Sequence, residues 1–122
     1  MIGWVIAAAG LAGLAWVVLR ARRRVRPVAK LQLLEGGEIT FEFPLRVMPA
    51  TIGREDGQTV AVSHPRVSRQ HAAITRDGEH FVLHDRSKHG TRVNGQVIET
   101  HVLASGDLIL LADAIQLIFT RL

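Results

Sequence analysis

From residue 31 onward the sequence alternates between short apolar runs and turn-forming residues, and this alternation restricts the fold more than any other feature. The predicted strands are LQLLE (31–35), ITFEF (39–43), AAITR (72–76), HFVLHD (80–85), LILLA (108–112) and IQLIFT (115–120). The breaks are Gly-Gly at 36–37, Glu-Asp-Gly at 55–57, Asp-Gly at 77–78, Asn-Gly at 94–95, Ser-Gly-Asp at 105–107 and Ala-Asp at 112–113. Asp-Gly and Asn-Gly between apolar runs are strong hairpin signals, and no run keeps a helical period. The pattern predicts an all-β sandwich or barrel from residue 31 onward.

The basic residues are concentrated in one short segment. The whole chain has 15 Lys and Arg against 11 Asp and Glu, which gives a formal net charge of +4. Residues 20–30 contain cations and no acid, whereas from residue 31 there are 9 Lys and Arg against 11 Asp and Glu, a balance of −2. A slightly acidic domain argues against a broad nucleic-acid-binding face. The absence of cysteine excludes disulfides, thiolate metal sites and cysteine nucleophiles.

Residues 2–19 form a run of 18 apolar or glycine residues without a charge. As a helix this run is about 27 Å long, close to the minimum needed to cross the hydrocarbon core of a bilayer. Trp4 and Trp16 lie near its two ends, where indoles favour the membrane interface. A secretory signal peptide would carry its positive charge before the apolar run, but here RARRRVR follows it. Residues 1–19 are therefore predicted to be an uncleaved transmembrane α-helix.

Residues 20–30 are predicted to be a basic juxtamembrane segment and a short linker. By the positive-inside rule they place the following domain in the cytoplasm and the N-terminus outside, most simply in a bacterial inner membrane. The arginines also suit anionic lipid headgroups, so a lipid-sensing role for this segment stays open. Ala9 and Gly13 have a spacing found in helix pairs, but a segment so rich in Ala and Gly contains it by chance. Self-association is left open.

Three groups of polar residues stand in the predicted loops, which antiparallel sandwiches collect at their ends. The first is TIGR, the second is VSRQH, and the third runs from Asp85 to Gly95. Together with L-x-x-G-D at 103–107, the order G-R, S-R-x-H, G-T-x-V-N-G resembles a forkhead-associated (FHA) domain over residues 31–122. The resemblance implies a twisted two-sheet antiparallel β-sandwich over residues 31–122. It also implies that loops at one end of the sandwich bind phosphothreonine peptides, with no catalysis and no cofactor.

Carried onto this sequence, the resemblance implies a phosphate site of cations and hydroxyls. Arg54 suits a phosphate because a planar guanidinium donates two parallel charge-assisted hydrogen bonds. The predicted phosphopeptide-binding residues are Arg54, Ser68, Arg69, Lys88, His89, Thr91 and Asn94. The predicted supports of the site are Gly53, His71, Gly90 and Gly95. His89 stands where the family commonly has an asparagine that bonds the peptide backbone, so peptide selectivity is expected to differ.

The predicted function is a membrane-tethered phosphopeptide-binding adaptor, with a Ser/Thr kinase or its substrates as implied partners. A phosphate-independent scaffold at the membrane is the alternative. Ser68, His71 and Asp85 are of the three residue types that form a hydrolase triad, but the serine does not lie in a nucleophile-elbow motif. Asp85 is expected to order its own loop by local hydrogen bonds. No HxH or HExxH pair supports a metal site. The protein is predicted not to be an enzyme.

Overall fold

The computed structural model describes residues 25–122, and within this range every element is a β-strand. The predicted strands are present as β1 (Ala29–Glu35), β2 (Glu38–Leu45), β5 (Ala72–Asp77), β6 (His80–Asp85), β10 (Leu108–Leu111) and β11 (Ile115–Arg121). Five shorter strands complete the fold: β3 (Ala50–Gly53), β4 (Val60–Ala61), β7 (Thr91–Val93), β8 (Gln96–Val97) and β9 (Thr100–Leu103). The all-β prediction is confirmed.

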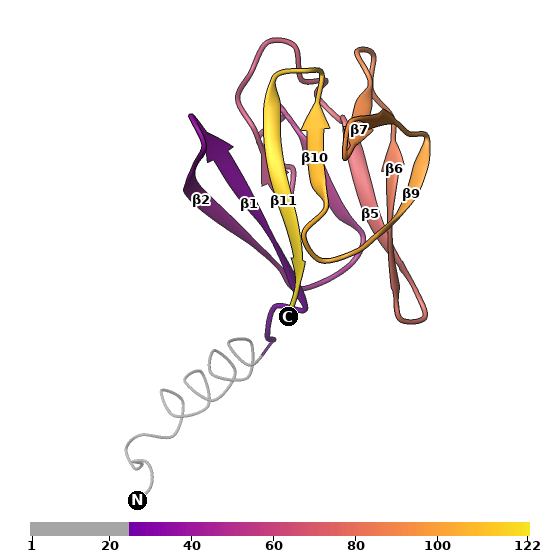
Figure 1. Cartoon of the computed structure of the whole chain (residues 1–122). Helices are drawn as coiled ribbons and strands as arrows, with labels where there is room; N and C mark the ends of the chain where they lie inside the picture. Colours follow the sequence, from indigo (N-terminus) through magenta and orange to yellow (C-terminus); the bar gives the residue numbers. More distant parts are fainter. Residues whose placement is uncertain (1–24) are drawn as a thin grey trace, which may run out of the picture.

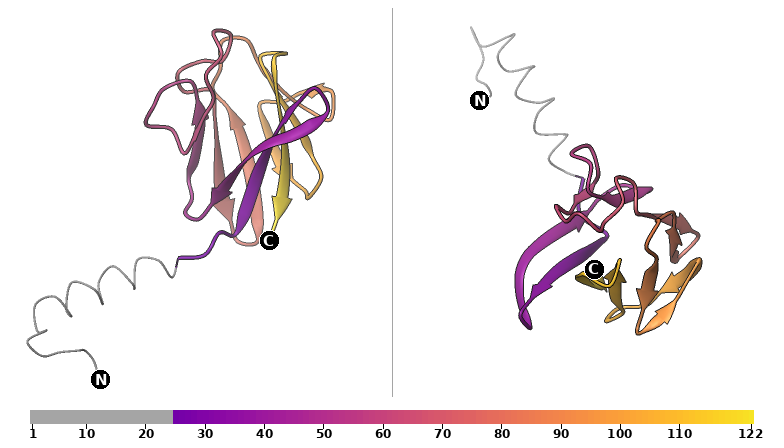
Figure 2. Two further views of the ribbon diagram at one scale, coloured as in Figure 1. Left: turned by 90° about the vertical axis from the view of Figure 1, so that its left-hand side faces the viewer. Right: turned by 90° about the horizontal axis from the view of Figure 1, so that it is seen from above.

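The strands form two sheets that pack face to face (Figure 1). One sheet has the order β2-β1-β11-β10-β7-β8, and the other has the order β4-β3-β5-β6-β9. The right-hand view of Figure 2 looks along the strands and shows the two layers, with β1 and β2 curving away as a long hairpin. Because sequential strands mostly pair as hairpins, the register of each pair is set by its turn.

The core lies between the sheets and is made by the residues that face inward from both sheets. In β11, Leu117 and Phe119 are fully buried while the intervening positions are more exposed. Phe119 packs against Phe81 of the opposite sheet, with ring centroids 5.6 Å apart. Full burial of such a side chain stabilises the fold by about 1.5–3 kcal/mol. Residues 25–122 thus contain a complete core of their own.

Two turns show why the hairpins form where the sequence predicts them. Asn94 and Gly95 have φ angles of 51° and 88°, the left-handed values that a two-residue type I′ turn requires. Asn and Gly adopt these values more easily than other residues. Ala112 and Asp113 adopt φ angles of 52° and 53° between β10 and β11, although alanine is not favoured there. This second turn is held by tertiary hydrogen bonds described below.

The structure differs from the prediction at two places. Among the described strand pairs, β3 and β4 are parallel rather than antiparallel, so Glu-Asp-Gly at 55–57 belongs to a longer loop and not to a hairpin. Thr51 and Thr59 hold this loop, because each backbone N–H donates to the other hydroxyl over 3.1 Å. The sandwich also begins before residue 31: β1 starts at Ala29, and Val28 N–H donates to Leu45 O over 2.8 Å. The linker is therefore shorter than predicted.

The loops and the chain entry lie at opposite ends of the sandwich. The turns after β3, β6 and β10 gather at the upper end in Figure 1, whereas residues 25–28 and the C-terminal residue lie at the lower end. The predicted transmembrane helix and the first residues of the basic segment, 1–24, lie outside the described residues. Within residues 25–122 the structure contains no helix that meets the length and hydropathy needed to cross a membrane.

Candidate functional site

Four loops meet at the upper end of the sandwich and are joined by hydrogen bonds between their backbones. They are the β3–β4 loop (54–59), the β4–β5 loop (62–71), the β6–β7 loop (86–90) and the β10–β11 turn (112–114). Arg54 N–H donates to Ser68 O over 3.0 Å, which joins the first two loops. Ala112 N–H donates to Gly90 O over 3.0 Å, which joins the last two. The loops therefore form one connected surface.

Arg54 is an exposed residue whose guanidinium is held by the neighbouring loop. Its Nε donates to the carbonyl oxygen of Val67 over 2.9 Å. Within residues 25–122 no hydrogen bond or ion pair occupies its two terminal nitrogens. Those two nitrogens are the pair that binds an oxyanion in a bidentate manner. Arg54 is thus fixed at its Nε and open at the end that suits a phosphate.

Ser68 lies between Arg54 and Lys88. Its hydroxyl oxygen accepts a hydrogen bond from the Lys88 backbone N–H over 3.0 Å, across the gap between two loops. Because this contact uses only a lone pair, the hydroxyl hydrogen is left to donate to an anion. The same contact brings the exposed Lys88 next to the serine. Arg54, Ser68 and Lys88 therefore come from three loops to one place.

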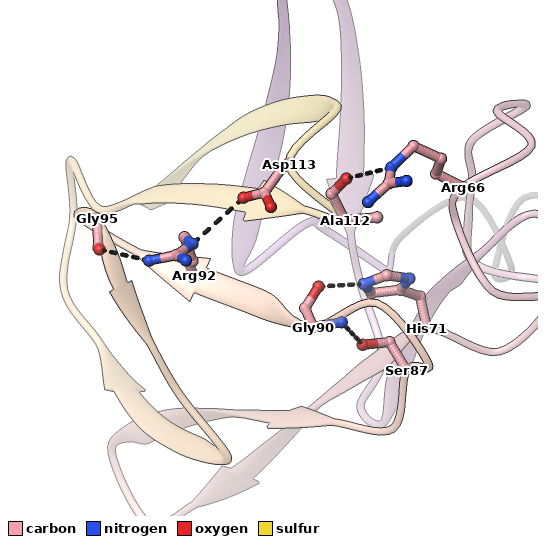
Figure 3. A network of polar contacts seen from close by, with 8 residues as sticks. All are labelled: Arg66, His71, Ser87, Gly90, Arg92, Gly95, Ala112 and Asp113. Carbon is pink, nitrogen blue, oxygen red and sulfur yellow. Dashed lines mark hydrogen bonds and ion pairs between the residues drawn. The ribbon is translucent and has the colours of Figure 1, made fainter.

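His71 lies beneath these loops and is fully buried. Its Nδ1 accepts from the Ser68 backbone N–H over 3.0 Å, so its Nε2 carries the hydrogen and donates to Gly90 O, also over 3.0 Å. One imidazole ring thereby ties the serine loop to the β6–β7 loop, as Figure 3 shows on the Gly90 side. Burial lowers the pKa of His71 against the opposing effects of the Gly90 carbonyl and the Asp85 carboxylate. The ring is therefore held neutral.

This lowered pKa predicts that the domain loses stability in mild acid. In the unfolded chain the histidine protonates near its ordinary value of 6.5, but in the folded domain it protonates only at lower pH. The unfolded state then binds more protons, so stability is complete above about pH 6.5 and falls as the pH drops toward the folded pKa. Thermal unfolding of residues 25–122 from pH 8 to about pH 5, above the range of ordinary carboxylates, measures the loss.

The matched variant for this measurement is His71→Gln, which retains hydrogen-bonding groups and does not titrate. Its unfolding temperature is expected to be lower at pH 8 but flatter across the range from 8 to about 5. An equal slope in both proteins would show that another of the histidines causes the acid sensitivity.

Asp85 organises the β6–β7 loop from its base. One oxygen of its carboxylate accepts from Ser87 N–H, from the Ser87 hydroxyl and from the Thr91 hydroxyl, over 3.1, 2.6 and 2.8 Å. The Ser87 hydroxyl in turn accepts from Gly90 N–H over 2.8 Å. Asp85 therefore orders its loop, as expected from the sequence. Thr91 is 1% exposed, so its position gives it a structural role in place of the predicted peptide contact.

Asn94 lies away from the four loops. Its side chain donates to Asp107 over 3.0 Å and accepts from Leu108 N–H over 2.9 Å, at the start of β10, whereas the loops lie at its end. Burial alone would raise the pKa of Asp107, but hydrogen bonds from Ala104 N–H, Asn94 and His101 outweigh it and lower the pKa. Asn94 therefore stabilises the β7–β8 and β9–β10 turns and lies outside the four loops. Gly95 O accepts from Arg92 Nη1 over 3.2 Å, and Arg92 also pairs with Asp113, so Gly95 is linked to the β10–β11 turn through one side chain.

The β10–β11 turn belongs to the site region but was not predicted to do so. Arg66 Nε donates to Ala112 O over 3.1 Å, and Arg92 pairs with Asp113 over 3.2 Å (Figure 3). The first contact holds the left-handed turn against the loop that carries Ser68, and the second holds it against β7. The sequence signal was present in Ala-Asp at 112–113 and in the cations of HPRVSRQHAAI, but no local pattern relates residues 46 positions apart.

Gly53 supports the site by leaving room for another backbone. A Cβ at this position would overlap the Arg69 carbonyl oxygen and lie 2.8 Å from the Arg69 carbonyl carbon. Gly90 supports the site for a different reason: nothing lies within 4 Å of its Cβ position, but its left-handed φ of 90° favours glycine.

The exposed side chains of Arg69 and His89 belong to the two loops that meet at Ser68. Residues 25–122 contain no group of three His, Asp or Glu residues that fits a metal ion.

Comparisons with known proteins agree on one family. The model of the FHA domain family matches residues 50–112, which span the β3–β4, β4–β5 and β6–β7 loops and end at Ala112, the first residue of the β10–β11 turn. A solved FHA domain described by its phosphothreonine-dependent interactions is 32% identical, with a TM-score of 0.69, over 77% of this chain and 96% of its own. The FhaA FHA domain, solved with the intracellular domain of Rv3910, is 33% identical, with a TM-score of 0.66, over 75% and 98%.

A more distant neighbour shares the fold. The N-terminal FHA domain of S. cerevisiae Rad53p, solved with a phosphothreonine peptide, is 20% identical, with a TM-score of 0.70, over 78% of this chain and 94% of its own. The comparison with curated proteins gives no significant match. The β-sandwich, the four joined loops and the match to the family model all lie within residues 25–122. The chain therefore belongs to the FHA domain family.

Proposed function

We propose that this protein is a membrane-tethered adaptor that binds phosphothreonine segments of partner proteins through the four-loop surface. The observation that carries the proposal is the state of Arg54, whose Nε is held by Val67 O while its terminal nitrogens are open. The Ser68 hydroxyl accepts from the Lys88 backbone N–H over 3.0 Å, and these two residues come from the two neighbouring loops. A dianionic phosphate has three acceptor oxygens, which one guanidinium, one hydroxyl and one ammonium satisfy.

The role of each loop residue follows from its contacts. Arg54, Ser68 and Lys88 bind the phosphate, and the exposed Arg69 and His89 face the flanking peptide. His71, Asp85 and Thr91 hold the loops in register and do not touch the ligand. Since neutral histidine offers one donor and one acceptor in a geometry unlike that of an amide, His89 selects peptides differently from an asparagine. The site binds and releases a ligand and performs no chemistry on it.

The tether is supported by the sequence of residues 1–24. The 18-residue uncharged run suits one membrane span, and the arginines after it suit the cytoplasmic side. The loop surface then lies at the end of the domain away from the chain entry and faces the cytoplasm. A bacterial inner membrane suits this simple topology, with a Ser/Thr kinase or its substrates as the phosphorylated partners.

Isothermal titration calorimetry of residues 25–122 at fixed salt tests phosphate recognition. A degenerate phosphothreonine peptide pool, its phosphoserine counterpart and the unphosphorylated pool serve as ligands. We expect micromolar binding to the phosphothreonine pool and at least about 100-fold weaker binding without phosphate, because two or three charge-assisted hydrogen bonds are lost. Equal binding to the unphosphorylated pool would favour a phosphate-independent scaffold.

A further inference from the structure

Three large exposed apolar side chains gather at the end of the sandwich where the chain enters. They are Val25, Val47 and Leu122, which are 49%, 67% and 66% exposed. Backbone hydrogen bonds bring their segments together, because Val28 N–H donates to Leu45 O over 2.8 Å and Leu122 N–H donates to Val28 O over 3.0 Å. Figure 1 and the left view of Figure 2 both show the C-terminal residue beside the entering chain. We call this surface the entry face.

Cations accompany the apolar side chains on the entry face. Arg26, Arg46 and Arg121 are exposed and are direct or near sequence neighbours of the three apolar residues. Arg121 donates to the backbone carbonyl of Glu79 over 2.6 Å and lies over the Phe81 ring at 5.0 Å, so its charge is not neutralised by these contacts. Asp77 ends β5 and Glu79 lies on the β5–β6 turn nearby, but within residues 25–122 neither carboxylate pairs with these arginines. The entry face is therefore apolar and cationic together.

The chain outside the described residues identifies what this face meets. Residues 20–24, RARRR, separate Val25 from the apolar run that ends at Leu19. Five residues span at most about 18 Å when fully extended. If residues 2–19 cross a bilayer, this short connection keeps the entry face within about 18 Å of the membrane surface. Apolar side chains with surrounding arginines are the combination that binds anionic lipid interfaces.

We propose that the entry face docks on the anionic lipid surface of the membrane, with Val25, Val47 and Leu122 in the interface and the arginines on headgroups. This inference rests on the proposed transmembrane tether and adds to it a fixed orientation of the domain. The strands then stand away from the membrane, and the four-loop surface points into the cytoplasm at the far end. A docked domain holds its four-loop surface at a fixed distance from the membrane, whereas a freely moving domain does not.

Depth-dependent fluorescence quenching tests the docking on the full chain. Because the sequence has no cysteine, V47C places one fluorophore on the entry face, and E38C places one at the far end of the β1–β2 hairpin. Both side chains are exposed, so neither substitution disturbs the core. The labelled chains are reconstituted in nanodiscs that contain spin-labelled lipids, once with anionic and once with only zwitterionic headgroups.

We expect the Val47 label in anionic nanodiscs to be quenched about threefold or more relative to the Glu38 label, and less in zwitterionic ones. Adding R46Q to V47C is expected to reduce the quenching, because it removes one headgroup contact. A chain retained in the nanodiscs with equal quenching at both labels would overturn the docking and leave the tether intact. Loss of the chain from the nanodiscs would contradict the tether itself, and the docking with it.

Discussion

Arg54→Ala is expected to weaken phosphothreonine peptide binding by at least about 100-fold while leaving the fold intact. The variant removes two open guanidinium nitrogens, and hydrogen bonds to charged groups are worth about 1.5–3 kcal/mol each. Stability is expected to change little, since Arg54 is exposed and its side chain makes one hydrogen bond within residues 25–122, to Val67 O. Calorimetry with one phosphopeptide gives the affinity, and thermal unfolding of the same samples gives the stability.

Two further variants separate the effect of the Arg54 side-chain geometry on peptide affinity from the effect of net charge. Arg54→Lys keeps the charge but loses both the Nε bond to Val67 O and the bidentate fork, so we expect about a 10-fold loss rather than full affinity. Arg46→Ala removes an equal charge at the opposite end of the domain and is expected to bind as the parent does. If Arg46→Ala weakened binding as much as Arg54→Ala, net charge and not the loop site would explain the affinity.

Gly53→Ala is expected to destabilise the domain by about 3 kcal/mol or more. The new Cβ overlaps the backbone carbonyl of Arg69. Neither backbone segment is free to move away from the other, because Arg54 N–H donates to Ser68 O over 3.0 Å and Glu55 N–H donates to Arg69 O over 3.3 Å. For a domain of this size the unfolding temperature is expected to fall by about 12 °C or more. Phosphopeptide binding is lost with the loop contacts.

Gly57→Ala is the matched control for this prediction. Gly57 lies in the β3–β4 loop that directly follows Gly53, but nothing lies within 4 Å of its Cβ position and its φ is not left-handed. Its substitution is expected to change the free energy of unfolding by less than about 1 kcal/mol, since it removes flexibility of the unfolded chain without a clash. A similar loss in both variants would mean that the loop tolerates no side chain at all, and the contact with Arg69 would not be the cause.

Much of the fold follows from local sequence patterns because hairpins are local structures. Asn94-Gly95 and the glycine of Asp77-Gly78 have the positive φ angles that their turns need, and β6, which follows the second turn, alternates between core and surface. The short strands β3, β4, β7, β8 and β9 were not delimited from the sequence, since two to four residues carry too little periodicity. The parallel β3–β4 pair depends on hydroxyl contacts between Thr51 and Thr59, which no turn pattern encodes.

The site was predicted less completely than the fold. The ordered motifs around Arg54, Ser68 and His71 located the loops, because their residue types and spacing carry the family resemblance. The same motifs also suggested Thr91 and Asn94 as ligand contacts, although one is buried and the other bonds Asp107. A motif specifies residue types along the chain and does not say which of them face solvent once the sheets have closed.

By itself the sequence determined the strand periodicity, the hairpin turns and the family, because each depends on residues close together in the chain. It also determined the uncharged run before the domain and the arginines that follow it. Only the tertiary structure decided which loops meet, how Arg54 is fixed by Val67 O, and that the entering chain and the loop surface lie at opposite ends. The physical reason is that such contacts join residues distant in sequence, so sheet order, register and twist set them.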